Sequence, residues 1–170
     1  MLGTSLFMAT EAMLFTGLGG SFTILRSQYT TWPPLGQPRL PVEATAVYSV
    51  LLLASGFACE RAARSQGTED RLRWLGVTLV LGSGFLLAQG QEWLALLGFG
   101  LSASSVFGDL FYALVGTHAL HVAGSVLLLA YAAFAVQRGR WGGVELGAVR
   151  MWWWFVVLVW PAIYALVYLA

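Results

Sequence analysis

Residues 113–124 read ALVGTHALHVAG, and they place two histidines three positions apart among apolar and very small side chains. The surrounding apolar run extends from about residue 107 to residue 136. As a helix, this run is long enough to cross the roughly 30 Å hydrocarbon core of a bilayer. Because ionisable groups are costly inside a bilayer, His118 and His121 require either partners or a function.

The composition of the whole chain also favours a membrane protein. Hydrophobic residues make up 58% of the 170 residues, and charged residues make up only 10%. Typical soluble domains contain about 45–50% apolar and about 25% charged residues. The mean hydropathy is +0.74. Such a chain cannot cover a surface in water, and it contains no basic block that would indicate a nucleic-acid partner.

Five apolar segments are long enough to span a bilayer. They lie near residues 2–25, 42–63, 73–98, 107–136 and 147–169. The first segment lacks a basic leader region and carries Glu11, which predicts a retained helix and not a signal peptide. A charged stretch, residues 60–73, predicts an aqueous loop. Since no internal repeat or linker is visible, we expect residues 1–170 to form one domain, an all-α bundle of five transmembrane helices.

The distribution of arginine predicts the orientation of this bundle. All nine basic residues are arginines, and only Arg26 and Arg39 fall on the side of the first and third connections. The other seven fall on the side of the N-terminus: Arg61, Arg64, Arg71, Arg73, Arg138, Arg140 and Arg150. The positive-inside rule therefore predicts a cytoplasmic N-terminus and an external C-terminus. Arg61, Arg64, Arg71 and Arg73 either contact anionic lipid headgroups or serve only to set this topology.

Four ionisable residues stand out within the predicted spans: Glu11, Glu92, His118 and His121. We expect the two carboxylates to be either proton-related or structural. Glu11 and the two histidines are expected near the middle of the bilayer, and Glu92 nearer the outer surface. We predict that each histidine forms a hydrogen bond with a neighbouring helix or a buried carboxylate. A proton relay is the main functional alternative.

Cofactor sites built on the two histidines are disfavoured. A bis-histidine haem needs ligands on opposite sides of the ring, and a di-metal bundle needs a Glu-x-x-His motif on each of two helices. Zinc held by both histidines and one glutamate is the remaining alternative. Cys59 is the single cysteine, which excludes a cysteine-based cluster. We therefore predict no metal, cofactor or catalytic centre in this chain.

Two further patterns concern how the helices pack. The run Trp152–Trp154 at the start of the last segment predicts aromatic anchoring at the headgroup level. Small residues, among them Gly17, Gly82, Gly116 and Gly124, predict close contact between helices.

Six stretches in order resemble subunit III of the haem–copper oxidases, in its five-helix bacterial form. They are ATEAMLFTGL (9–18), WPPLGQP (32–38), VLLLASGFACERA (50–62), GFLLAQGQEW (84–93), FYALVGTHALHVAGS (111–125) and WWWFVVLVWPAIYALVYL (152–169). Gln89, Glu92, His118 and His121 are the polar residues within this signature. Trp154 and Val157 stand where the family usually has His and Asp, so we expect a polar contact of the last helix to be missing.

The resemblance implies a non-catalytic subunit of a respiratory oxidase in the bacterial cytoplasmic membrane. It implies contacts with subunit I, with subunit II and with phospholipid, while haem and copper lie in the partner subunits. It also implies a role for Glu11 in proton uptake and oxygen access. One alternative is the related subunit associated with nitric oxide reductase. Another, of a different class, is a free-standing proton-coupled transporter, although the inverted repeats typical of transporters are absent from the sequence.

Overall fold

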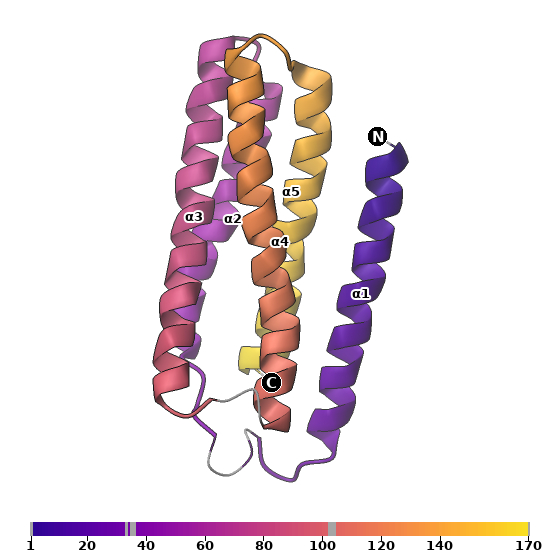
Figure 1. Ribbon diagram of the computed structural model, residues 1–170, viewed down its shortest axis with the longest axis vertical. Coiled ribbons are helices and arrows are strands. Elements are labelled where there is room, and N and C mark those ends of the chain that lie inside the picture. Colours follow the sequence, from indigo (N-terminus) through magenta and orange to yellow (C-terminus); the bar gives the residue numbers. More distant parts are fainter. Residues whose placement is uncertain (1, 33, 35–36, 102–104, 170) are drawn as a thin grey trace.

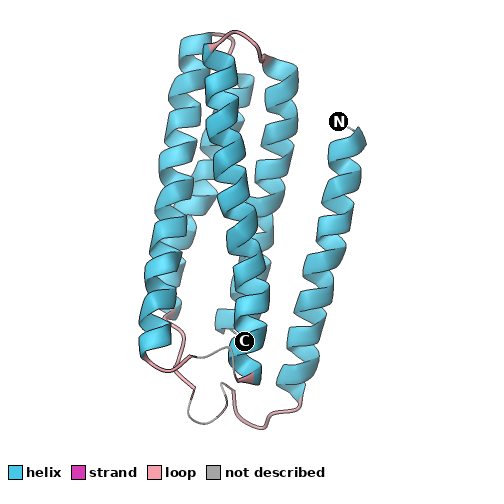
Figure 2. Cartoon of the chain, in the orientation of Figure 1, coloured by secondary structure: helices cyan, strands magenta, loops and turns pink. Residues whose placement is uncertain are grey.

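The computed structural model describes residues 2–32, 34, 37–101 and 105–169, and every regular element in these ranges is a helix (Figure 2). The elements are α1 (Leu2–Ser27), α2 (Val42–Arg64), α3 (Thr68–Gly98), α4 (Val106–Gln137), α5 (Gly143–Tyr164) and a short π-helix, η1 (Ala165–Leu169). The predicted all-α bundle of five helices is therefore confirmed. Residues 33, 35 and 36 of the WPPLGQP motif lie outside the described residues.

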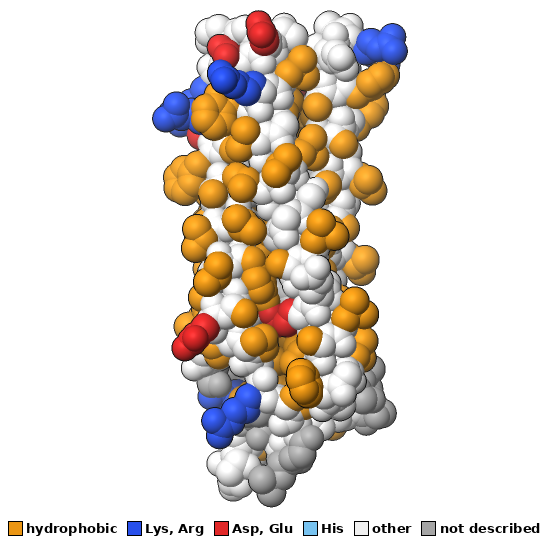
Figure 3. Space-filling model, turned by 90° about the vertical axis from the view of Figure 1, so that its left-hand side faces the viewer, with side chains coloured by type: hydrophobic (Ala, Val, Ile, Leu, Met, Phe, Trp, Pro, Cys, Tyr) orange, Lys and Arg blue, Asp and Glu red, His pale blue; other side chains and the backbone are white. Residues whose placement is uncertain are grey.

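Four of the helices are long and apolar enough to cross a bilayer: α2, α3, α4, and α5 together with η1. The chain is thus a multi-pass membrane protein. On the face drawn in Figure 3, basic side chains lie only towards the two ends of the bundle, and the stretch between them is mainly hydrophobic. Helix α1 has 26 residues, but Glu11 and several glycine, serine and threonine residues lower its hydropathy. Its crossing of the bilayer stays a prediction.

Two helices begin earlier than the apolar runs predicted. Helix α3 begins at Thr68, and Glu69 and Asp70 in its first turn favour the positive end of the helix dipole. Helix α5 begins at Gly143, where the Glu145 carboxylate accepts a hydrogen bond from the Gly142 amide at 2.9 Å. The stretch 60–73, predicted to be an aqueous loop, is therefore mostly helical. Its charged side chains can interact favourably with the helix termini while they remain in contact with water.

Helices α2, α3, α4 and α5 pack around a shared core, and α1 stands at the side of this group against α4 and α5 (Figure 1). The N-terminus lies at the same end as the α2–α3 and α4–α5 connections, and the C-terminus lies towards the opposite end. This arrangement brings the seven arginines named above to one end. Which side of the membrane that end faces stays a prediction.

The tryptophan run does not act as one anchor, because successive helix residues point about 100° apart. Trp153 is completely buried, and an ideal Cβ at Gly82 would lie 3.0 Å from its ring. The expectation of headgroup anchoring is wrong for this residue. The close approach predicted at Gly82 is confirmed, whereas Gly17 and Gly124 face open space in the described structure.

We expect Gly82→Val to lower the free energy of unfolding by about 1–3 kcal/mol, because the added methyl groups would overpack the Trp153 ring. Gly76→Val is the control, since a Cβ at Gly76 meets nothing within 4 Å. Thermal unfolding in detergent micelles measures both variants. Equal stability of the two variants would contradict the packing described for Trp153.

Candidate functional site

A carboxylate–imidazole pair joins α1 to α4 inside the bundle. The Glu11 Oε2 atom lies 2.9 Å from His121 Nε2, and the two side chains are only 16% and 17% exposed. The ring of His121 also meets the edge of Phe15, with the centroids 5.2 Å apart. The prediction that a buried carboxylate is the partner of a histidine is therefore confirmed for His121.

The geometry fixes the number of protons that this pair holds. His121 Nδ1 lies 2.7 Å from the Thr117 carbonyl oxygen, and a carbonyl only accepts hydrogen bonds, so Nδ1 carries a hydrogen. A hydrogen bond between His121 Nε2 and Glu11 Oε2 then needs one more proton, on either the nitrogen or the oxygen. In both arrangements the pair is neutral overall, which lowers the cost of burying it.

His121 has polar neighbours on its own helix and on α5, and its side chain lines a groove. Ser125 Oγ donates to the His121 carbonyl at 2.6 Å and accepts from Trp152 Nε1 at 2.8 Å. His121 lines a groove of about 720 Å³ that also contacts Thr4 and Glu145, near the N-terminal ends of α1 and α5. The pair is thus connected to the end of the bundle at which the chain begins.

His118 behaves differently from His121. It is 1% exposed, stacks on Trp160 with ring centroids 5.0 Å apart, and meets the edges of Phe15 and Phe85. Neither ring nitrogen has a hydrogen-bond partner among the described residues. The predicted hydrogen bond is therefore wrong for His118, because the helix turns this ring into an aromatic core.

A second buried carboxylate, Glu92, lies nearer the end of the bundle that carries the C-terminus. Glu92 Oε1 accepts from Tyr168 Oη at 2.7 Å, and Glu92 Oε2 lies 2.8 Å from Thr45 Oγ1. The amide Nε2 of Gln89 lies 3.4 Å from Glu92 Oε1 and 3.3 Å from Tyr168 Oη. The structure thus brings Gln89 and Glu92 together, with partners from α2 and η1.

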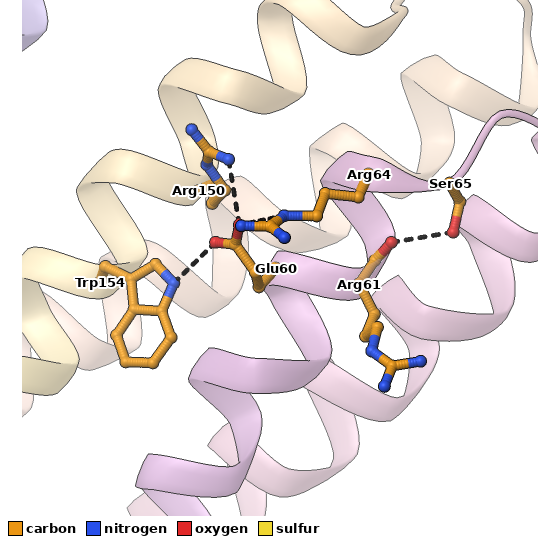
Figure 4. Close-up of polar contacts among 6 residues, drawn as sticks. All are labelled: Glu60, Arg61, Arg64, Ser65, Arg150 and Trp154. Carbon is orange, nitrogen blue, oxygen red and sulfur yellow. Dashed lines mark hydrogen bonds and ion pairs between the residues drawn. The ribbon is translucent and has the colours of Figure 1, made fainter.

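A third carboxylate, Glu60, organises the arginine-rich end (Figure 4). Its Oε1 atom accepts from Arg64 Nε at 2.6 Å and from Arg150 Nη1 at 3.1 Å, and its Oε2 atom accepts from Trp154 Nε1 at 3.0 Å. The expectation that α5 lacks a polar contact at Trp154 is wrong, because the indole N–H supplies one.

The other predicted headgroup residues are used differently. Arg61 lies over the Trp74 ring at 5.8 Å, and Arg71 Nε donates to the Ser65 carbonyl at 2.9 Å. Arg73 is exposed. Headgroup binding by these residues stays a prediction.

A groove runs along α1 towards the Glu60 cluster. It has a volume of about 850 Å³, with Glu60, Arg64 and Arg150 at one end and mainly apolar side chains of α1 and α5 along the rest. The groove therefore has charged side chains at one end and apolar side chains along the remainder.

Metal-ligating side chains do not converge in the described part of the chain: no three of its His, Cys, Asp or Glu residues form a group that could hold a metal ion. Both nitrogens of His121 are engaged, and His118 is enclosed by aromatic rings. These two histidines are therefore poorly placed to act as ligands.

Sequence reasoning missed Thr45, Glu60, Arg150 and Tyr168 as members of these sites. The available signals were weak. Glu60 and Arg64 have the i,i+4 spacing of a helical ion pair. Tyr168 lies four residues after Tyr164 in an otherwise apolar tail, and nothing in the sequence indicates that its hydroxyl reaches Glu92.

Comparison with known proteins gives a consistent result. The sequence model of the family described as cytochrome c oxidase subunit III matches residues 1–170. A cytochrome c oxidase subunit 3 of Synechocystis is 35% identical over 99% of this chain and 75% of its own length. A probable cytochrome c oxidase subunit 3 of Nocardia farcinica is 32% identical over 98% and 86%. A cytochrome bo(3) ubiquinol oxidase subunit 3 of Pseudomonas putida is 28% identical over 99% and 84%.

We expect Glu60→Ala to lower the free energy of unfolding by about 1–3 kcal/mol, because Arg150 and Trp154 lose their common acceptor. The control is Glu43→Ala, which removes an exposed glutamate of the same helix. Chemical unfolding in detergent measures both. If the two variants are equally stable, the Glu60 cluster does not hold α2 against α5.

Proposed function

Because the chain belongs to the cytochrome c oxidase subunit III family, we propose that it is the non-catalytic subunit III of a respiratory haem–copper oxidase. The family match over the whole chain carries this proposal. The subunit would contact subunit I directly, and subunit II within the same complex, in the cytoplasmic membrane of a bacterium. Haem and copper would lie in those partner subunits.

The Glu11–His121 pair is the proposed functional centre. It holds one proton beyond the hydrogen on Nδ1, and that proton can sit on either residue without changing the charge of the pair. His121 lines a groove towards the arginine-rich end, which offers a route by which the proton can exchange. We infer that the pair supports proton uptake by the catalytic subunit.

The groove along α1 and α5 is the proposed site of a structural phospholipid. The headgroup would meet Arg64 and Arg150, and the acyl chains would follow side chains such as Phe155 and Leu166. An acyl-filled groove would also admit molecular oxygen, which is apolar, so it is our candidate for oxygen access.

The first test of this assignment is isolation of the tagged chain from its native membranes in mild detergent. We expect a coloured complex whose visible spectrum shows haem and in which mass spectrometry identifies oxidase subunits I and II. A stable, colourless and solitary protein would contradict the assignment. Nitric oxide reductase subunits in the complex would instead favour the related reductase.

The second test is Glu11→Gln in that complex. The amide can still donate to His121 Nε2, so packing is kept, but the side chain can no longer exchange a proton. We expect unchanged haem content, slower proton uptake and a shorter period of sustained turnover than in the wild type. Glu43→Gln is the matched control, at an exposed glutamate. Loss of haem from Glu11→Gln, or unchanged proton uptake, would count against the proposed role.

A further inference from the structure

Glu92 is a buried carboxylate that forms no ion pair with the described residues. It is 8% exposed, and in the described ranges no arginine or histidine nitrogen forms an ion pair with it. The other two interhelical carboxylates, Glu11 and Glu60, both contact basic side chains. An unpaired charge at such a position would be very costly.

The hydrogens around Glu92 do not suffice if it is ionised. Thr45 Oγ1 lies 2.8 Å from both the Pro41 carbonyl oxygen and Glu92 Oε2, and it accepts from Tyr48 Oη at 3.0 Å. A threonine hydroxyl has one hydrogen. With an ionised Glu92, that one hydrogen would have to be shared between the two acceptors in a three-centre bond, which satisfies neither of them fully.

Protonation of Glu92 resolves this conflict. A hydrogen on Glu92 Oε2 is donated to Thr45 Oγ1, and the Thr45 hydrogen goes to the Pro41 carbonyl. Thr45 Oγ1 then donates once and accepts twice, which uses all of its capacity. Glu92 Oε1 remains free to accept from Tyr168. Each short contact becomes a hydrogen bond.

We propose that Glu92 is a proton-binding site whose hydrogen bonds link α3 to α2 and η1. Thr45 comes from α2, Glu92 from α3 and Tyr168 from η1, so the protonated acid makes hydrogen bonds to two other elements, and its proton completes the one to α2. The site is separate from the Glu11–His121 pair and does not depend on the oxidase assignment.

The bound proton has an exit. Glu92 lines a groove of about 430 Å³ together with Tyr48 and the exposed Arg39. Among the described residues, the titratable and charged groups that bind Glu92 or line its groove are Tyr168 from η1, Tyr48 from α2, and Arg39 from the α1–α2 connection. When the acid O–H bond breaks, the proton passes to water in this groove. The Thr45 hydroxyl then again has one hydrogen for two acceptors, Glu92 and the Pro41 carbonyl, so its contacts with them weaken.

Infrared spectroscopy of the full chain in lipid vesicles tests the proposal at neutral pH. We expect the C=O stretching band of a protonated carboxylic acid in the wild type and its partial loss in Glu92→Gln. Glu43→Gln, at an exposed glutamate of the same end of the bundle, should retain the whole band. Thr45→Val removes the acceptor of the acid proton and should shift the band. A spectrum in which no acid band depends on Glu92 would overturn the proposal, whether the carboxylate is ionised or holds a metal cation.

The pH dependence of stability is the second measurement. Because the proposal places a proton on Glu92 in the folded chain, linkage predicts that the wild type loses stability as the pH rises and the band disappears. Glu92→Gln carries an uncharged amide at this position and should lack that component. If the difference in melting temperature between the wild type and Glu92→Gln stays constant over the pH range in which the band disappears, the proposal is overturned. If Glu92→Gln fails to fold, the test rests on two other observations: the wild-type band should disappear as the pH rises, and it should be shifted in Thr45→Val. A band that Thr45→Val leaves unshifted would then overturn the proposal.

Discussion

The hydrogen bond between Glu11 and His121 is the interaction on which the five-helix arrangement depends. Helix α1 packs mainly on α4 and α5, and it is the one of the five described helices that is not a candidate membrane span by length and hydropathy. Van der Waals contact and polar contacts drive helix association in a bilayer, because lipid tails are as apolar as the helices. The carboxylate–imidazole pair fixes α1 at a specific position along α4. The small residues of α1, such as Gly17 and Gly20, make no close contact that would fix this position.

The same chemistry recurs at three levels of the bundle, each time with different partners. Glu60 ties α2 to α5 through basic groups and an indole. Glu11 ties α1 to α4 through an imidazole that shares its proton. Glu92 ties α3 to α2 and η1 through hydroxyl groups. The partners of each acid therefore differ in kind. Glu60 pairs with cationic arginines at one end of the bundle, whereas we propose that Glu11 shares a proton with an imidazole and that Glu92 binds a proton among hydroxyl groups.

The fold follows from the sequence because long apolar runs allow only a helical arrangement in a bilayer. The partners of the polar residues do not follow so readily. All five helices are apolar around most of their circumference, so the sequence pattern gives little information about which face turns inward. Trp153 and His118 show the result: both carry polar nitrogens, and both lie in the hydrophobic interior with those nitrogens unbonded in the described structure. Glu11 and His121 were identifiable because each is an ionisable group in an apolar run, although nothing in the sequence specified that they meet.

The long sequence separation of Glu11 and His121 has a consequence for biosynthesis. The two residues are 110 positions apart, so at about 5–20 residues per second the imidazole is made on the order of ten seconds after the carboxylate. Helix α1 must wait for that time next to the bilayer with its acid unmatched. The Glu11–His121 hydrogen bond can form only when α4 has been made. Both helices that α1 packs against, α4 and α5, are thus made only after α2 and α3.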